Sequence, residues 1–243
     1  IEMTEHQLTE IRNYLLAKKL PIDILIEVND HFVSQISDLQ REENLGFVEA
    51  FEKTKLSWKQ ELSIEIVPFG VSETKFVRRV KRKQNLDFFF YTLKIFAPIL
   101  ISSLLISNFG NVKIFIFFFS AVLIFAFSSP MMIQILNYKD FELSRKYKKI
   151  QLNTLQNISN IGSISIMYFV LFFKDFFKKS EQIFYILNGN YIRILNINER
   201  NATMLCIMSF ILIFMFIFFS IKLYFFAKKV KEVRPFLSQF LMN

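Results

Sequence analysis

Four long apolar stretches in the last two-thirds of the chain constrain its fold more than any other feature. The hydrocarbon core of a bilayer takes roughly 20 apolar residues of α-helix to cross. The stretches begin near Asp87, Val112, Ile158 and Thr203, and the second reads VKIFIFFFSAVLIFAFSSPMMIQIL. They predict four transmembrane helices, over about residues 87–108, 112–137, 155–174 and 203–227, and hence an all-α membrane protein.

The formal net charge of +9 is distributed unevenly along the 243 residues. Residues 1–74 contain 14 acidic residues and 7 Lys or Arg, whereas residues 75–83 contain six basic residues and no acid. Because the basic residues flank apolar stretches, anionic lipid headgroups and topology explain them better than nucleic acid does. We therefore expect headgroup contacts from the basic collar, defined as Lys75, Arg78, Arg79, Lys81, Arg82 and Lys83.

The distribution of Lys and Arg also predicts the orientation of the chain. The segments 75–83, 139–149 and 228–234 hold fifteen basic residues, and the alternate loops hold six. Cytoplasmic loops carry the excess of positive charge, so both termini are expected in the cytoplasm. Abundant Phe, Ile, Lys and Asn suggest an A+T-rich genome, either that of a bacterium or another of this composition. Residues 1–20 hold no continuous apolar run, so no signal peptide is expected there.

Residues 1–66 show helical periodicity and predict a soluble three-helix domain. Thr4 and Gln7 form a capping-box pattern. Pro21 suits the first turn of a second helix, and Asn44-Leu45-Gly46 separates this helix from a third. The apolar residues recur at three- and four-residue spacing: Leu8, Ile11, Leu15 and Leu16, then Ile22, Leu25, Phe32, Ile36 and Leu39, then Phe47, Phe51 and Trp58.

About residues 4–60 resemble a small helical domain called HAAS, found at the front of many bacterial membrane proteins. The matching features are Leu20-Pro21, then Glu27, Asp30, His31 and Phe32, then Gly46 followed by Glu49-Ala50. Leu56-Ser57-Trp58 stands where the family commonly has a Gly-Asp-Pro turn. The resemblance implies a cytoplasmic prefix domain linked with signalling or with transport permeases, and it does not imply catalysis.

Glu27, Asp30 and His31 lie at positions i, i+3 and i+4 of the second predicted helix and therefore share one face. We interpret them as a candidate docking face for a protein partner. The alternative is a divalent metal site, although two carboxylates and one imidazole are too few for a closed zinc site. Neither a metal nor a cofactor is expected.

The segment 67–86 is predicted to join the soluble domain to the membrane. Pro68 and Gly70 suit a hinge. Ser72 is a candidate N-cap for a basic amphipathic helix lying at headgroup level. The chain then divides into a helical domain at 1–66, this connection, a transmembrane domain at 87–234 and a tail at 235–243.

Small and polar residues in the spans are candidates for helix–helix contacts. The prolines are also expected to kink their helices. Such residues could instead line a narrow polar pathway, and this alternative stays open. The candidate contacts are Pro98, Ser128, Pro130, Asn157, Asn160 and Ser163.

The loop between the third and fourth spans contains Asn188-Gly189 between two β-prone runs. An Asn-Gly pair favours a type I′ turn, so a small β-hairpin is predicted at or just above the membrane. An irregular loop is the alternative.

The sequence contains no motif that names a reaction: it has no Gly-rich phosphate loop, GxSxG, HExxH or paired cysteines. We therefore expect a non-enzymatic bacterial inner-membrane protein with a cytoplasmic docking or regulatory head. Its expected partners are anionic lipids and either another protein or further copies of itself. The alternative function is an accessory or membrane subunit of a transporter, or a small homo-oligomeric channel.

Overall fold

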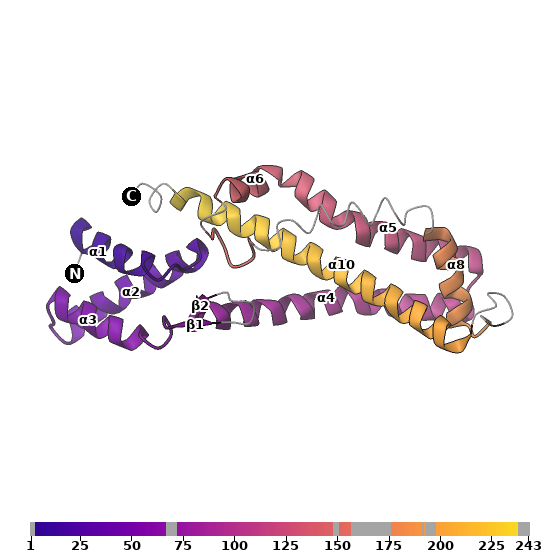
Figure 1. Cartoon of the computed structure of the whole chain (residues 1–243), viewed down its shortest axis with the longest axis horizontal. Coiled ribbons are helices and arrows are strands. Elements are labelled where there is room, and N and C mark those ends of the chain that lie inside the picture. The colour runs from indigo at the N-terminus through magenta and orange to yellow at the C-terminus, as the bar shows by residue number, and fades with distance from the viewer. Residues whose placement is uncertain are drawn as a thin grey trace. The chain divides into compact units, whose positions relative to one another are not determined.

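A computed structural model describes residues 3–66, 72–147, 151–156, 176–190, 192 and 198–237, and these are mostly helical (Figure 1). The chain divides into two compact units. The first unit contains residues 1–85, 143–156 and 228–243, and the second contains residues 86–142 and 157–227. Helices α4 and α10 each contribute to both units.

The first unit is built on three helices at the predicted positions: α1 (Glu5–Leu16), α2 (Ile22–Glu42) and α3 (Phe47–Trp58). The capping box of α1 is present, because Thr4 N–H donates to Gln7 Oε1 at 2.9 Å and Gln7 N–H donates to Thr4 Oγ1 at 3.3 Å. Six of the predicted apolar positions, Ile11, Leu15, Leu25, Phe32, Ile36 and Phe51, lie in a buried core, to which Val28 also belongs.

The connection after α3 differs from the predicted hinge and amphipathic helix. Strand β1 (Ile64–Ile66) pairs antiparallel with β2 (Ser72–Thr74), and α4 (Lys75–Phe109) follows directly. The predicted N-cap Ser72 was wrong, because Ser72 belongs to β2 and Val77 N–H donates to Thr74 Oγ1 at 3.3 Å. Thr74 caps the helix because the β-pairing holds the chain extended up to this residue.

The predicted headgroup-level helix is the first part of α4, and its apolar residues pack into the core of the first unit. Val77 is buried there, and Phe76 and Val80 pack against the same core. The Phe76 ring lies 5.6 Å from the Trp58 ring of α3. This face is therefore covered by protein, which leaves the basic residues on the other faces of the helix.

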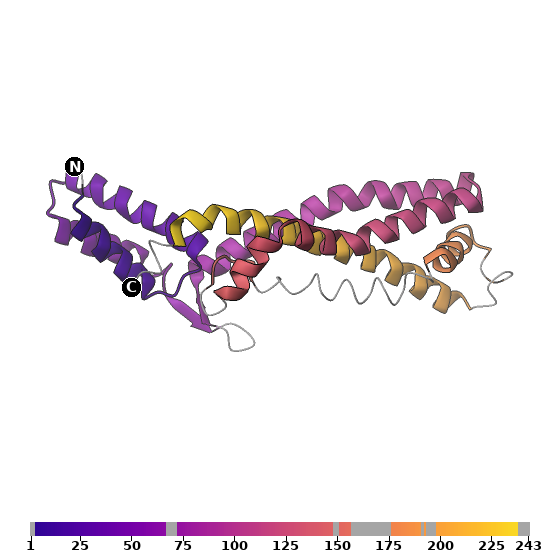
Figure 2. The same ribbon diagram turned by 90° about the horizontal axis from the view of Figure 1, so that it is seen from above.

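The second unit contains the apolar helices. Helix α5 (Val112–Leu136) and helix α10 (Glu199–Val233, continued by a short 3₁₀ turn, Arg234–Phe236) run in the same direction. The ribbon views show this common direction (Figures 1 and 2). Phe119 lies 5.5 Å from Phe210, and Phe127 lies 4.1 Å from Phe216. The apolar part of α4 runs the opposite way, with Phe96 and Phe88 contacting Phe210 and Phe225. A short helix, α6 (Tyr138–Lys146), follows α5.

Three of the described helices are long and apolar enough to cross a membrane: Lys75–Phe109, Val112–Leu136 and Glu199–Phe236. Only 11–33 % of the residues in their most apolar windows are buried within the protein. Apolar surface of this extent is typical of helices that face lipid. The third predicted span, 155–174, lies outside the described residues except for Leu155 and Gln156.

The predicted β-hairpin is contradicted in its first arm, because residues 183–187 belong to helix α8 (Phe176–Leu187). The helix forms because Phe176, Ser180, Ile183 and Phe184 share one buried face. Gly189, with φ +79°, ends it in a Schellman motif: Gly189 N–H donates to Ile186 O and Asn190 N–H donates to Tyr185 O. The same Asn-Gly pair thus closes a helix instead of a hairpin turn. The second arm lies largely outside the described residues.

Candidate functional site

The predicted docking face lies on the exposed side of α2. Glu27, Asp30 and His31 are all exposed, and the His31 ring lies 6.1 Å from the ring of Trp58. The apolar side of the same helix carries Val28 and Phe32 into the core. Among the residues that the structure describes, no group of three or more His, Cys, Asp or Glu side chains is arranged to hold a metal ion. The face thus presents two carboxylates and one imidazole at the surface of the helix.

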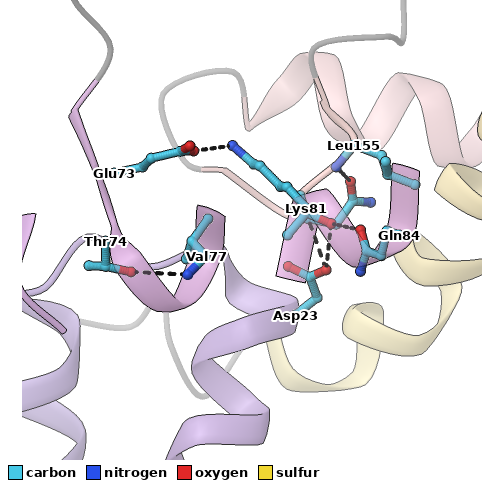
Figure 3. A network of polar contacts seen from close by, with 9 residues as sticks. Asp23, Glu73, Thr74, Val77, Lys81, Gln84 and Leu155 are labelled. Carbon is cyan, nitrogen blue, oxygen red and sulfur yellow. Dashed lines mark hydrogen bonds and ion pairs between the residues drawn. The ribbon is translucent and has the colours of Figure 1, made fainter. Parts of the chain in front are cut away.

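One turn before Glu27, Asp23 lies at the centre of a buried polar network (Figure 3). Lys229 Nζ donates to Asp23 Oδ2 at 2.6 Å, and Thr154 N–H donates to the same oxygen at 3.3 Å. Thr154 Oγ1 donates to Gln84 Oε1 at 2.9 Å. The Asp23 side chain is 8 % exposed and the Lys229 side chain 23 %. The network therefore ties together α2, the segment 151–156, α4 and the end of α10 within the first unit.

Backbone and apolar contacts reinforce this junction. Ile22 N–H donates to Gln151 O at 2.9 Å, and Asp23 N–H donates to Leu152 O at 3.2 Å. The first turn of a helix has no intrahelical partners for its N–H groups, so the segment 151–152 supplies them. Ile22 also packs with Leu152, Val233 and Leu237. Sequence reasoning missed this junction, because Asp23 and Lys229 lie 206 positions apart.

One carboxylate oxygen of Asp23 does not take part in the network. Asp23 Oδ1 is buried and has no hydrogen-bond partner among the described residues. A buried acceptor without a partner lowers stability. Buried ion pairs contribute little net stability, although they can specify one arrangement of the segments they join. The geometry of Asp23 thus favours a specific junction over a strongly stabilising one.

The basic collar is partly neutralised by glutamates of the same unit. Arg79 pairs with Glu61 at 2.9 Å, and Lys81 pairs with Glu73 at 2.6 Å (Figure 3). Glu65 accepts from Arg78 at 3.1 Å and lies 3.5 Å from Lys75. In the described part of the chain, Arg82 and Lys83 are the collar residues without such a pair, and both are exposed. The collar therefore divides into four paired residues and two residues that remain open to anions.

The candidate helix contacts have different surroundings. Pro98 lies within α4 and Pro130 within α5, while Asn157, Asn160 and Ser163 lie outside the described residues. Ser128 donates to Phe125 O of its own helix at 3.4 Å. Its neighbour Ser129 makes the contact between helices, since its Oγ lies 2.6 Å from that of Ser220 in α10. Nothing in the sequence distinguished Ser129 from Ser128, because the rotation of a helix depends on its partners.

Helix α8 packs on α5 through apolar rings and a pair of hydroxyl groups. Phe176 lies 5.4 Å from Phe127, and Phe184 lies 5.4 Å from Phe115. Between them, Ser180 Oγ and Ser120 Oγ are 2.8 Å apart. Sequence reasoning placed this segment in the outer loop between the third and fourth predicted spans. Its apolar face instead lies against a predicted span.

Comparison of the chain with protein-family models, with curated proteins and with solved structures finds no match.

Proposed function

We propose that the chain is a non-enzymatic bacterial inner-membrane protein that presents a cytoplasmic docking surface on a membrane anchor. The observation that carries this proposal is the exposed acidic face of α2, whose neighbour Asp23 is bound to Lys229 at the end of an apolar helix. A partner on Glu27 and Asp30 would lie one or two turns from that junction. The resemblance of residues 4–60 to the HAAS domain supports the same role in signalling or in transport.

Four membrane crossings account best for the arrangement of the second unit. Helices α5 and α10 run in the same direction, as the Phe119–Phe210 and Phe127–Phe216 contacts indicate. If both helices cross the bilayer, the chain has to return across it between them. A fourth crossing between residues 156 and 199 supplies that return. It also leaves the amino-terminal unit and the end of α10 on one side, which the excess of Lys and Arg assigns to the cytoplasm.

The docking role is tested by site-specific photo-crosslinking of the full-length protein in its native membrane. The photoreactive residue replaces Glu27 or Asp30, and in the control it replaces Glu10 or Glu49, which are equally acidic and exposed. We expect a discrete crosslinked product from the α2 positions only. The product should disappear when the other acidic residue of the pair is changed to Lys, that is, Asp30→Lys with the probe at Glu27, or Glu27→Lys with the probe at Asp30. Identical products from all four positions, or none from α2, would contradict the proposal.

The second candidate function is a subunit of a transporter or a small homo-oligomeric channel. The observation that favours it is the charged helix α8 lying against α5, because charged groups inside membrane domains commonly mark ion or substrate pathways. Ion flux through liposomes containing the purified protein would discriminate the two functions. An ion flux that the Lys178→Gln substitution alters would favour the channel. The absence of any ion flux would favour the docking protein.

A further inference from the structure

If α5 crosses the bilayer, helix α8 carries charged residues at the depth of the hydrocarbon core. Helix α5 has 25 residues, and the hydrocarbon core accommodates roughly 20 of them. Every such placement leaves residues 117–131 of α5 within the core. Ser120 and Phe127 are among these residues, and they contact Ser180 and Phe176 of α8. Lys178 and Lys179 lie between those two contact points and therefore share their depth.

The charged residues of α8 face away from α5. Phe176, Ser180, Ile183 and Phe184 form the buried face against α5. At 100° per residue, the opposite face carries Lys178, Glu181 and Gln182, whereas Tyr185 packs against the apolar cluster of the second unit. Lys178 and Glu181 are exposed. Facing lipid, these charges would be strongly unfavourable, so charged residues in membrane segments almost always face protein or water.

The polar face of α8 is continuous with the aqueous phase. It runs from the exposed Lys178 and Glu181 through the half-buried Gln182 toward the polar residues Asn188 and Asn190, where the helix ends. Phe184 lies beside Phe115, near the start of α5, so this end of α8 lies at the bilayer surface where α4 turns into α5.

The charges of α8 also disfavour a second copy of the chain as the cover of this face, because Lys178 and the neighbouring Lys179 outnumber Glu181.

From this placement we propose that the polar face of α8 is a water-exposed surface within the membrane region. Water reaches it from the side of the α4–α5 turn and extends at least to Lys178. The helix then lies within the membrane region and not in an outer loop. The Lys178 ammonium at the inner end of this surface suits small anions that enter with the water. The inference rests on α5 crossing the bilayer, as proposed above.

Thiol labelling of the full-length protein in intact membranes tests the proposal. The background is Cys206→Ser, which removes the one native thiol. Single variants Lys178→Cys, Glu181→Cys and Gln182→Cys are treated with a membrane-impermeant maleimide from the side of the α4–α5 turn. Asn190→Cys serves as the accessible control and buried Ile183→Cys as the inaccessible one. Labelling in denaturant confirms that each thiol is present.

We expect the three polar-face thiols to react within about tenfold of the Asn190→Cys rate, since thiol reactivity follows access and thiolate content. Polar-face thiols as unreactive as Ile183→Cys would overturn the proposal. The Lys178→Cys variant could also resist the maleimide and form a disulfide-linked dimer. That result would show that a second copy covers the polar face, and it would contradict the proposal as well.

One further variant separates this inference from the proposed membrane topology. Phe125 of α5 is 72 % exposed within the protein and lies at the centre of the predicted span. Phe125→Cys should resist the impermeant reagent if α5 crosses the bilayer. Rapid labelling of Phe125→Cys would contradict the crossing itself. Its protection together with unreactive polar-face thiols would overturn only the inference about water.

Discussion

At the scale of single residues, the contact between Asp23 and Lys229 decides how the amino-terminal helices are joined to the end of the last apolar helix. Both charges are largely buried, and Asp23 retains an oxygen without a partner among the described residues. Breaking such a pair costs more than the pair contributes, because one charge then remains buried and uncompensated. The junction should therefore be sensitive to the loss of either partner alone.

We predict that Lys229→Met lowers the free energy of unfolding of the first unit, because Asp23 is left buried without the Lys229 ammonium group. The loss should lie near the lower end of the range of about 3–5 kcal/mol that is typical of a broken buried ion pair. Asp23→Asn should restore part of that loss in the double variant. The measurement is thermal unfolding in detergent followed by Trp58 fluorescence, which reports on the first unit because Trp58 is the one Trp of the chain and packs against Phe32 and Phe76. Exposed Lys228→Met is the control. Equal effects of the two Lys variants would contradict a buried pair.

At the scale of elements, local sequence signals identified the amino-terminal helices. They did not identify helix boundaries that depend on contacts with other elements. The Thr4–Gln7 capping box and the apolar spacing of α1, α2 and α3 were predicted, because these features act within a few residues. The start of α4 directly after Thr74 was not predicted, since it depends on the pairing of β1 with β2. Asn188-Gly189 signals positive φ, and only the contacts of α8 with α5 decide that a helix precedes it.

The end of α8 provides a test at this scale. Gly189 has φ +79°, and a Cβ there meets nothing within 4 Å, so a substitution costs only backbone strain. We predict that Gly189→Val lowers stability by about 1–2 kcal/mol, whereas Gly189→Asn has a smaller effect because Asn tolerates this conformation. Thermal unfolding of the whole protein in detergent measures both. Equal stability of the Val and Asn variants would count against the Schellman ending.

The basic collar offers a second test at the scale of an element. Arg82→Gln/Lys83→Gln and Arg78→Gln/Arg79→Gln remove the same charge from exposed positions of one helix. We predict that the first double variant loses more bound anionic lipid, because each unpaired base near the membrane contributes on the order of 1 kcal/mol. Glu61 and Glu65 already offset Arg79 and Arg78. Native mass spectrometry of retained phosphatidylglycerol gives the comparison, and equal losses would show that the glutamate pairs do not matter.

At the scale of the whole molecule, composition predicted a helical membrane protein, and the three apolar helices agree with it. The charged residues Lys178, Lys179 and Glu181 hid the packing of α8 on α5, because hydropathy averages a helix over all its faces. The Asp23–Lys229 junction was equally hidden, since no local pattern links residues 206 positions apart. The sequence therefore indicated which segments are apolar, and the packing indicated which of their faces matter.

The central claim is that the chain crosses the bilayer four times and returns its last helix to the side of its amino-terminal unit. The most direct measurement is labelling of single cysteines in intact cells with a membrane-impermeant maleimide, in the Cys206→Ser background. The exposed probe positions are Glu10, Asn108, Lys139, Asn190 and Lys228. We predict labelling from outside at Asn108 and Asn190 and protection at Glu10, Lys139 and Lys228. Labelling of Lys228 from outside while Glu10 stays protected would contradict the account.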